Sequence, residues 1–588
     1  MSLWNAITKK RARSLRQPRK LTLEPLENRR VMSVKFVLSE AVLNITGTDA
    51  DDKVELHEMR SNPASPVADL LQFSWKDNQG KSGKWGCKAA ALSKIVFQGN
   101  GGDDVLRNVS NPTGSPTFAA PGVRKVISML PSIEAHGGAG DDTLYGGPKG
   151  DFLYGDEGDD KLYGGAGDDN LYGGANNDTL RGDAGDDKLY GGAGDDFYDF
   201  GNSYLGGGSL GFDRIYESST DPSTARSADW LRFGGIEGCM SRAVDVNLGI
   251  IVKQRVNDFL TLQLSDAAGI ENVEGTGYDD VIRGNARDNC LYGNNGNDRL
   301  YGMAGTDKLY GGIGNDALFG GPGADKLYGG PGNDSLLVND DQDVDIAFGQ
   351  TGDDRFLVRV GTGGANDTTD WTTKDAHIFF EDGVLATVPF SNFATPGVYA
   401  AGQWTTQDIE WVDAAFSEVV WRTNNNKLVK TANGGEMTFV RQGNTLAGPA
   451  GIAGWNDPNA PNGRISINQH GINLGRTLIM DTVFHEIGHN WDREYNAAGW
   501  WALSGWTNAD PENSAYSKGT NQNVNWWYLS SAAFSSADSY YSQSDPDEDF
   551  AESFTAYFLE RAGLPSVANQ IPKKIVFIDN MCTSMTTP

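Results

Sequence analysis

The sequence predicts a multidomain chain in which an all-β parallel β-roll, a form of β-solenoid, is followed by an α+β domain. Two observations predict this. A nine-residue repeat rich in glycine and aspartate recurs in register through the middle of the chain, and a short fixed period is typical of a solenoid. Near residue 400 the pattern changes to apolar residues at helical spacing, as in Ile409, Val412 and Phe416, which indicates helices.

The chain is strongly acidic, with 78 acidic and 49 basic residues and a net charge of −29. Nucleic-acid binding requires a basic face, so this balance excludes nucleic acid as a partner and suits a protein that collects cations. No run of 18 apolar residues occurs, so we expect no transmembrane helix. The four cysteines are too few and too scattered for a disulfide framework or a cysteine-based zinc site.

The first 33 residues are basic, and no apolar segment of a conventional signal peptide follows them. The stretch Leu-Glu-Pro-Leu-Glu-Asn-Arg from Leu23 onward resembles the leader of large extracellular proteins of planctomycete-type bacteria. The resemblance implies that residues 1–33 are an export leader and that the protein is extracellular, secreted or at the cell surface; a basic disordered tail is the alternative. Residues 34–136 carry short alternating apolar runs, and we expect a β-rich N-terminal cap there.

The repeats fill residues 137–200 in a first block and 275–360 in a second, with irregular β coils expected in the connector at 201–274. Glycine at repeat positions one, two and four permits positive φ in a tight turn. The sixth-position carboxylate supplies the hard oxygen that Ca²⁺ prefers. Asn289 stands in the sixth position of one copy, so a weak site is expected there. The expected calcium ligands are Asp142, Asp151, Asp160, Asp169, Asp178, Asp187, Asp298, Asp307, Asp316, Asp325 and Asp334.

The eighth position of the repeat is nearly always Leu, which we expect to point inward from a very short strand. Each unit buries little by itself, so the array needs stacking and several bound Ca²⁺ ions to fold. This pattern resembles the RTX, or hemolysin-type, calcium-binding β-roll. A disordered Gly/Asp-rich linker is the alternative, and the constant phase of the copies counts against it.

After a linker at 361–400, a domain over 401–588 carries the sequence His485-Glu486-Ile487-Gly488-His489. Two histidines four residues apart on a helix project from one face and can bind a single catalytic Zn²⁺. Glu486 is then placed to take a proton from zinc-bound water. No histidine follows His489, so a third ligand from downstream must be a carboxylate, which excludes the metzincin arrangement. An accidental match on a surface helix is the alternative.

A second helix is expected from Pro546, with Glu548 and Glu552 one turn apart. Spacing alone does not choose between these two carboxylates as the zinc ligand. The two motifs together resemble the catalytic domain of anthrax toxin lethal factor and its relatives. The resemblance implies a zincin-like metallopeptidase in which Glu548 is the zinc ligand, Glu552 is a second carboxylate near the metal, and Tyr541 is the catalytic tyrosine that stabilises the oxyanion.

These patterns together predict a secreted, calcium-stabilised, zinc-dependent endopeptidase that hydrolyses peptide bonds by Glu-assisted attack of zinc-bound water. Its expected partners are a protein or peptide substrate and cell-surface or matrix components. The strand at 464–468 is either the edge of the substrate cleft or an ordinary core strand. The alternative function is that of a non-catalytic extracellular calcium-binding surface or matrix protein with a vestigial zincin domain.

Overall fold

The computed structural model divides into two compact units, Met1–Glu274 and Gly275–Pro588, which are described separately. The residues that the structure describes are 34–59, 70–77, 81–88, 92–108, 130–201, 209–217, 228–234, 242–338, 343–360, 368–369, 376–382, 386–388, 397–423, 437–447, 454–456, 464–467, 476–492, 516–518, 527–529, 546–562 and 578.

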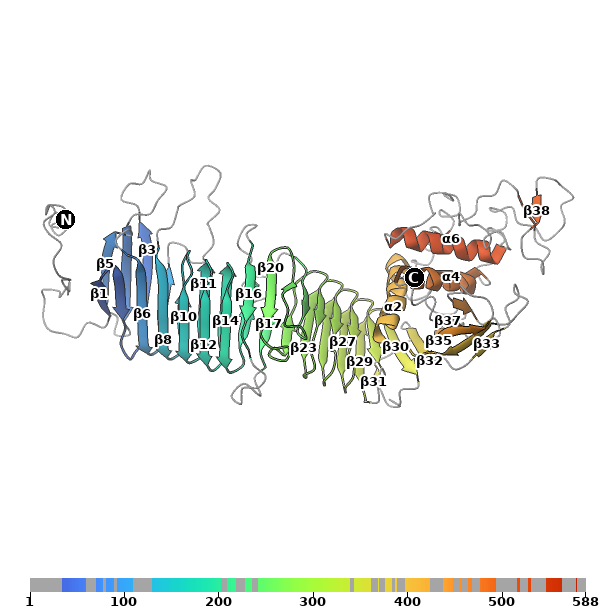
Figure 1. Ribbon diagram of the computed structural model, residues 1–588, viewed down its shortest axis with the longest axis horizontal. Helices are drawn as coiled ribbons and strands as arrows, with labels where there is room; N and C mark the ends of the chain where they lie inside the picture. Colours follow the sequence, from blue (N-terminus) through green and yellow to red (C-terminus); the bar gives the residue numbers. More distant parts are fainter. Residues whose placement is uncertain are drawn as a thin grey trace. The chain divides into compact units, whose positions relative to one another are not determined.

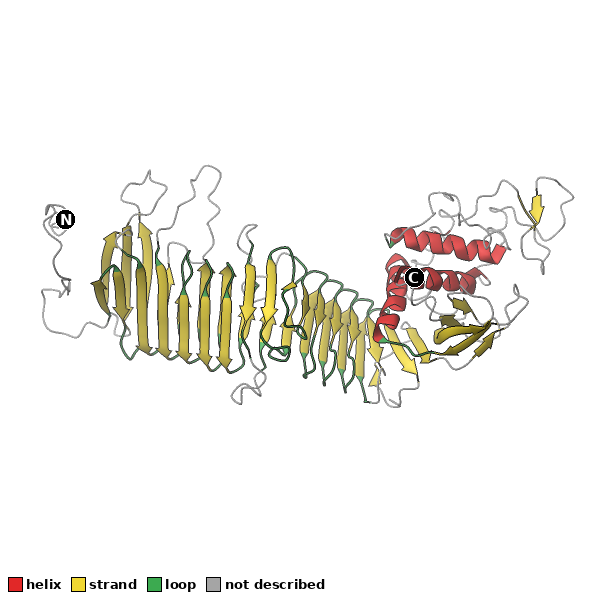
Figure 2. Ribbon diagram, in the orientation of Figure 1, coloured by secondary structure: helices red, strands yellow, loops and turns green. Residues whose placement is uncertain are grey.

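The first unit is built from strands that stack along the chain (Figures 1 and 2). Its strands are β1 (Lys35–Ser39), β2 (Val42–Thr46), β3 (Asp52–Met59), β4 (Leu70–Asp77), β5 (Ser82–Lys88), β6 (Lys94–Gly101), β7 (Val105–Asn108), β8 (Ser132–Ala139), β9 (Thr143–Tyr145), β10 (Phe152–Glu157), β11 (Lys161–Ala166), β12 (Asn170–Ala175), β13 (Thr179–Ala184), β14 (Lys188–Ala193), β15 (Phe197–Asp199), β16 (Gly211–Ile215), β17 (Trp230–Arg232), β18 (Asp245–Asn247), β19 (Gln254–Arg255), β20 (Leu260–Leu264) and β21 (Asn272–Glu274).

From β6 to β17, successive strands of this unit alternate between two sheets. One sheet has the order β1-β2-β6-β8-β10-β12-β14-β16-β20-β19, and the other includes β21-β17-β15-β13-β11-β9-β7-β3-β4-β5. From β8 to β15 each strand pairs in parallel with the strand two elements later, as Leu153 of β10 pairs with Leu171 of β12. Two nine-residue repeats therefore make one coil, and the prediction of a parallel β-roll is confirmed for the repeats.

The repeat sequence explains the two faces of each strand. The eighth-position leucines, such as Leu153, Leu171 and Leu189, are 0% exposed, so they form the interior as predicted. The ninth-position tyrosines point the other way and stack on one another, with ring centroids 4.7 Å apart for Tyr154 and Tyr172. Burial of one apolar side chain per strand is small, so stability has to accumulate over many coils.

The second unit contains a second roll followed by a sheet-and-helix region. Its elements are β22 (Val281–Arg283), β23 (Cys290–Asn295), β24 (Arg299–Tyr301), β25 (Lys308–Ile313), β26 (Ala317–Phe319), β27 (Lys326–Pro331), β28 (Ser335–Val338), β29 (Ile346–Thr351), β30 (Arg355–Val360), β31 (Thr368–Thr369), β32 (Ala376–Asp382), β33 (Ala386–Val388), β34 (Gly397–Ala401), α2 (Thr406–Thr423), β35 (Met437–Ala447), β36 (Gly454–Asn456), β37 (Arg464–Ile467), α4 (Arg476–Asp492), β38 (Tyr516–Lys518), β39 (Trp527–Leu529) and α6 (Pro546–Arg561).

One sheet of the second roll continues into the C-terminal region. It runs β22-β24-β26-β28-β30-β32-β35-β34-β33, and the pairs β30–β32, β32–β35 and β35–β37 are parallel. The segment between residues 361 and 400 thus includes β32, a member of this sheet. Strand β37 pairs with β35 on one side and with β36 on the other. It is therefore an interior strand, which favours the core strand over the cleft edge, the two alternatives that the sequence left open.

Helix α2 packs on the outer face of this continuous sheet. The expected apolar positions Ile409, Val412 and Phe416 are buried in one cluster with Tyr301 and Phe319 of the roll. The helix begins with a capping box, because the Asp408 N–H donates to Thr405 Oγ1 (3.2 Å) and the Thr405 N–H donates to Asp408 Oδ2 (3.3 Å).

A buried ion pair also joins α2 to the roll. Arg355 of β30 and Asp413 of α2 lie 3.3 Å apart between Nε and Oδ1, and both residues are at most 3% exposed. Asp413 Oδ1 also accepts a hydrogen bond from Ser335 Oγ at 2.8 Å. A buried charge pair of this kind is costly to break, so the second roll and the C-terminal helices share one core.

Helices α4 and α6 lie side by side in the second unit (Figure 1). Phe484 of α4 and Phe558 of α6 stack with centroids 5.4 Å apart, and Val483, Ile487 and Phe554 are buried in the same core. Helix α6 begins at Pro546, the residue at which the sequence predicts the start of a helix. Among the helices that the structure describes, none has a stretch apolar and long enough to cross a bilayer.

Candidate metal sites

The sixth-position aspartates form continuous rows along the rolls. The Asp142 N–H donates to Asp160 Oδ1 (2.7 Å), and the Asp160 N–H donates to Asp178 Oδ1 (2.8 Å). The second unit repeats this pattern with Asp298 and Asp316 (2.8 Å). Each Oδ1 therefore binds the backbone of the preceding coil, which leaves the other carboxylate oxygen, Oδ2, for a different partner.

Most of these Oδ2 atoms are buried and lack a hydrogen-bond partner among the described residues. A buried carboxylate oxygen without a partner carries a large desolvation cost, so it marks a place where a cation fits. The aspartates with such an Oδ2 include Asp142, Asp160, Asp169, Asp178, Asp187, Asp298, Asp307, Asp316 and Asp334, all on the list predicted from sequence. Asp325, also predicted, is buried, and its Oδ1 accepts the Asp307 N–H at 2.8 Å.

Backbone carbonyls converge on the same points. A Cβ atom on Gly155, at position one, would overlap Asp160 Oδ2 and would lie 2.5 Å from the carbonyl oxygen of Gly173 in the next coil. The glycine thus leaves room for a ligand between one carboxylate and one carbonyl. Hard oxygen atoms of these two kinds are the ligands that Ca²⁺ takes in proteins, so the residues of these loops fit a calcium ion.

Burial changes the acidity of the rows. It raises the pKa of Asp160 to about 6, that of Asp142 to about 7 and that of Asp178 to about 9, and neighbouring aspartates raise these pKa values further. In the second unit burial likewise raises the pKa of Asp316 to about 7 and that of Asp334 to about 9. Charged aspartates in these rows therefore require a nearby cation.

A few loops are closed by their own backbone. The N–H of Gly147, at position two, donates to Asp151 Oδ2 (2.5 Å), and the Ile133 N–H donates to Asp151 Oδ1 (2.7 Å). In the copy with asparagine, the Asn285 N–H donates to Asn289 Oδ1 (2.8 Å). Neither Gly147 nor Asn285 has a positive φ, whereas Gly174 and Gly165, at position two of open loops, have φ of +124° and +106°. The conformation of position two thus decides whether its N–H occupies the carboxylate.

Three aspartates outside the predicted ligand list share the open arrangement. Asp104, Asp196 and Asp213 are at most 1% exposed, and Oδ2 of each has no hydrogen-bond partner among the described residues. The Asp52 N–H donates to Asp104 Oδ1 (2.7 Å) and the Asp104 N–H donates to Asp142 Oδ1 (2.6 Å), so Asp104 extends the row towards the N-terminus. The run Gly99-Asn100-Gly101-Gly102-Asp103-Asp104 resembles the first six positions of the repeat and could have indicated Asp104 as a ligand. The residues between it and position 137 put it out of register with the nine-residue period.

The residues expected to bind zinc lie on two helices. His485, Glu486 and His489 are within α4, and Glu548 and Glu552 are within α6. His485 is half-buried; the other four side chains, and the whole of Tyr541, lie outside the described part of the structure. Among the described side chains there is no group of three or more His, Cys, Asp or Glu around one point.

The backbones of these helices approach closely at one place. A Cβ atom on Gly488 would lie 2.8 Å from Ala551 Cα and 3.3 Å from Ala551 Cβ. A side chain at position 488 would therefore force the helices apart. Gly488 belongs to the His-Glu-x-x-His stretch, and Ala551 lies between Glu548 and Glu552 in the sequence.

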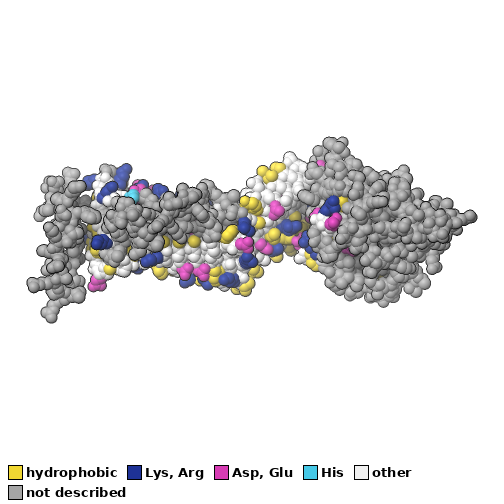
Figure 3. Space-filling view, turned by 90° about the horizontal axis from the view of Figure 1, so that it is seen from above, with side chains coloured by type: hydrophobic (Ala, Val, Ile, Leu, Met, Phe, Trp, Pro, Cys, Tyr) yellow, Lys and Arg dark blue, Asp and Glu magenta, His cyan; other side chains and the backbone are white. Residues whose placement is uncertain are grey.

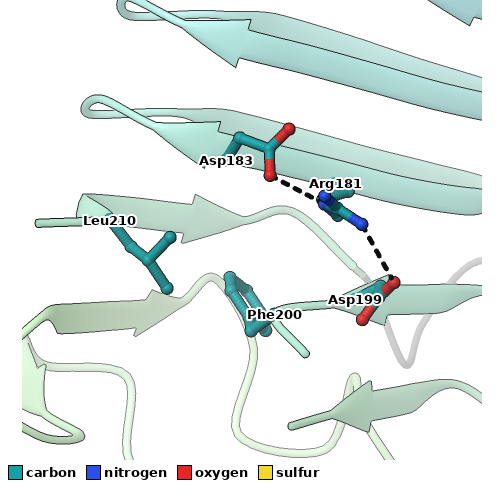
Figure 4. Close-up of a pocket in the computed structure, with 5 residues that line it drawn as sticks. All are labelled: Arg181, Asp183, Asp199, Phe200 and Leu210. Carbon is teal, nitrogen blue, oxygen red and sulfur yellow. Dashed lines mark hydrogen bonds and ion pairs between the residues drawn. The ribbon is translucent and has the colours of Figure 1, made fainter. Parts of the chain in front are cut away.

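The first unit contains a small pocket lined by Arg181, Asp183, Asp199, Phe200 and Leu210 (Figure 4). Arg181 lies between two carboxylates, with Nε 2.7 Å from Asp183 Oδ1 and Nη1 3.9 Å from Asp199 Oδ2. The guanidinium is 5% exposed and its charge is balanced by these aspartates. This arrangement is an internal ion-pair cluster at the end of a tyrosine stack and not a site for a charged ligand.

Figure 3 shows that lysine and arginine side chains are scattered among acidic and hydrophobic ones on one face of the described residues. Much of the acidic excess is internal, because sixth-position aspartates such as Asp160, Asp178 and Asp334 are at most 1% exposed. The aspartate carboxylates that repel one another therefore lie inside the rolls, where bound cations can neutralise them.

Comparison with protein families identifies the repeats. The model of the RTX calcium-binding nonapeptide repeat, in four copies, matches residues 136–171, 172–203, 274–309, 301–336 and 310–345. The predicted RTX repeats are thus confirmed in both blocks. The domain that follows residue 345 lies outside these matches. A search of curated proteins finds no match to the chain.

Proposed function

We propose that the protein is an extracellular zinc-dependent endopeptidase whose catalytic domain is carried on calcium-stabilised β-rolls. The observation that carries the proposal is the His485-Glu486-Ile487-Gly488-His489 sequence within α4, packed against a second helix that contains Glu548 and Glu552. The zinc ligands would be His485, His489 and Glu548.

The contact between the two helices supports this assignment. Around the Gly488–Ala551 contact, the aromatic core lies on one side, where Phe484 and Phe558 stack. With 3.6 residues per turn, helical positions 485 and 489 follow on the other side of Gly488. Positions 548 and 552 likewise follow on the side of Ala551 away from the phenylalanines. The backbone register therefore gives the histidine and glutamate positions a common side of the helix pair.

The proposed reaction assigns one role to each residue. Zinc, when bound, polarises the scissile carbonyl and a water molecule. Glu486 takes the proton from the attacking water and passes it to the leaving amine. Glu552 supports the zinc ligands by hydrogen bonding, and Tyr541 donates a hydrogen bond to the developing oxyanion.

The rolls supply the setting for this chemistry. RTX calcium-binding repeats occupy both predicted blocks, and extracellular fluid supplies the Ca²⁺ that open loops of this kind require. Export, through the leader expected at residues 1–33, is part of the proposal. Protein or peptide substrates are the proposed partners, with cell-surface or matrix components bound by the outer faces of the rolls.

The test compares Glu486→Gln with the wild-type chain, both loaded with calcium and zinc. We expect the variant to retain zinc and to lose peptidase activity on an unfolded protein by about 10²-fold or more, since it cannot act as a base. Glu560→Gln, an exposed position on α6, is the control and should remain active. If zinc-loaded wild type cleaves nothing in a broad peptide library, the non-catalytic calcium-binding surface protein becomes the better description.

A further inference from the structure

The last coil of the first repeat block contains a substitution at repeat position one. Leu189 of β14 pairs with Ile215 of β16, and the next residues along both strands, Tyr190 and Tyr216, stack with centroids 4.4 Å apart. In this register the residue that follows, Glu217, occupies the place that Gly191 holds one coil earlier. A residue with a long acidic side chain thus replaces a glycine.

The oxygen atoms beside the position-one glycine differ at this coil from those in the preceding coils. In the preceding coils, the carbonyl oxygen of each position-one glycine points at the position-one glycine of the coil before it. The Gly173 carbonyl oxygen would lie 2.5 Å from a Cβ on Gly155, and the Gly191 carbonyl oxygen would lie 2.6 Å from a Cβ on Gly173. The Glu217 carbonyl is used elsewhere, because it accepts a hydrogen bond from Ser265 Oγ (2.7 Å). The atoms around Gly191 are instead Asp196 Oδ2, Glu217 Oε1 and the Tyr198 hydroxyl.

The side chains around Gly191 are held in place inside the roll. Tyr198 is 0% exposed and stands at the eighth position, which is leucine in neighbouring coils. Its hydroxyl accepts the Gly191 N–H (2.8 Å) and donates to Glu217 Oε1. The Glu217 N–H donates to Ser265 Oγ (3.0 Å). The carboxylate of Glu217 is therefore fixed beside the glycine by a buried phenol, by the Gly191 N–H, which donates to Oε1 (3.2 Å), and by its own anchored backbone.

Asp196 supplies the second carboxylate. It is 0% exposed, its Oδ1 accepts the Asp178 N–H (2.8 Å), and its Oδ2 has no hydrogen-bond partner among the described residues. Two carboxylates that share a buried space repel each other unless a cation lies between them. Two anionic oxygens and a hydroxyl form a set of hard ligands that suits Ca²⁺.

We propose that Asp196 and Glu217 hold a Ca²⁺ ion at the end of the first repeat block, with the Glu217 carboxylate in place of the carbonyl that the preceding sites use. Tyr198 is the positioning residue that orients this carboxylate. The inference rests on calcium binding by the repeats and does not depend on the peptidase. Because this site has one more carboxylate than its neighbours, it binds Ca²⁺ more tightly than they do.

The experiment counts Ca²⁺ bound to the full-length chain by equilibrium dialysis after removal of metal with EDTA. Glu217→Gln should lose the most tightly bound Ca²⁺ ion of the wild type, or bind that ion at least 10-fold more weakly. The matched control is Glu157→Gln, which removes the same charge from an exposed position in an earlier loop of this row, and it should match the wild type. Equal stoichiometry and affinity in wild type and Glu217→Gln overturn the proposal, and a wild type that binds no Ca²⁺ overturns the role of the whole row.

A second measurement decides the matter if Glu217→Gln does not fold. Tb³⁺ replaces Ca²⁺ and emits when a nearby phenol transfers energy to it. Tyr198→Phe keeps both carboxylates and an aromatic ring inside the roll, so it should bind Tb³⁺ but show lower emission on tyrosine excitation. Tyr172→Phe, in the half-exposed tyrosine stack, is the control and should lose less. Equal emission from wild type and Tyr198→Phe contradicts the site.

Discussion

The sixth-position aspartates have two kinds of surroundings, although they are the same residue in the same repeat. Asp160 has one oxygen without a hydrogen-bond partner among the described residues, and Asp151 has both oxygens bonded to backbone N–H groups. A carboxylate that accepts two amide hydrogen bonds has little need of a cation. We therefore propose that Asp160 binds Ca²⁺ and that Asp151 holds its loop closed without it.

Substitution by asparagine separates these two roles. Asp160→Asn should lower the number of Ca²⁺ ions bound and should stabilise the metal-free roll, because a buried charge is removed. Asp151→Asn should leave the number unchanged and lower stability by about 1–3 kcal/mol, because asparagine has one acceptor oxygen and its NH₂ group would face one of the two N–H groups that Asp151 binds. Equilibrium dialysis and urea unfolding of the two variants provide the comparison. A loss of bound Ca²⁺ in Asp151→Asn as large as in Asp160→Asn would contradict the division.

Glu548 and Glu552 are one helical turn apart on α6, and their proposed roles differ. Glu548→Ala should lose most of its zinc on mild dialysis, because it removes a ligand. Glu552→Ala should bind zinc about 10–100-fold more weakly and still take it up at saturation, the usual effect of losing a group that supports a ligand. Measuring the zinc content of both variants shows which glutamate contributes more to zinc binding. The reverse order would exchange the roles and would remove the register on which Tyr541 depends.

At the scale of the element, the pair α4–α6 depends on a glycine. Gly488, within the His-Glu-x-x-His stretch, lies so close to Ala551 that a Cβ at position 488 would be 2.8 Å from the Ala551 Cα. The nearest atom belongs to backbone and cannot rotate away. The small side chains at 488 and 551 therefore let the two helix backbones approach closely.

Gly488→Ala should separate these helices. We expect a loss of about 1–3 kcal/mol of stability, the usual cost of overpacking, reduced by the better helix propensity of alanine. Zinc affinity should fall in parallel. Adding Ala551→Gly should restore only part of the loss, since the closest atom is Cα. Gln407→Ala, at an exposed position of α2, is the control for thermal unfolding. An unchanged melting temperature and zinc affinity in Gly488→Ala would contradict the close contact.

At the scale of the whole molecule, the calcium rows link pH to folding. Burial raises the pKa of Asp160 to about 6, of Asp316 to about 7 and of Asp334 to about 9, against about 4 in the unfolded chain. A group with a raised pKa in the folded state stabilises the fold below its unfolded pKa, and this contribution is lost as pH rises through its folded pKa. Metal-free rolls should therefore lose stability progressively as the pH rises from about 4 to about 9.

Circular dichroism of the full chain in EDTA should show less β signal at pH 8 than at pH 5. Saturating Ca²⁺ should restore the signal at pH 8, because the ion replaces the protons, and acidification should weaken Ca²⁺ binding. Magnesium at the same concentration and ionic strength is the control for charge screening. A fully formed roll at pH 8 in EDTA would show that the aspartate rows do not need a cation.

Within the second unit, the roll packs against the helices of the proposed catalytic domain. Tyr301 and Phe319 of the roll share a core with α2, and Arg355 of β30 pairs with Asp413 of that helix. From the sequence alone, residues 361–400 are expected to be a linker. Side-chain contacts across the sheet could not be deduced from it, because the change in periodicity near residue 400 is also what a separate domain would produce.

The fold of the rolls and the starts of two helices could be predicted from the sequence, because they depend on local patterns. A strict period of nine with glycine and aspartate in fixed places leaves one solution, a stacked coil with leucine inside, and helical spacing with caps located the starts of α2 and α6. Which loops are open and which are closed is visible in the folded structure alone, because the backbone φ at position two sets whether the N–H of that residue donates to the carboxylate. The structure also shows that β37 is an interior strand and that Glu217 and Asp196 both lie beside Gly191. These contacts join residues whose separation along the chain follows no repeat, so the sequence pattern does not predict them.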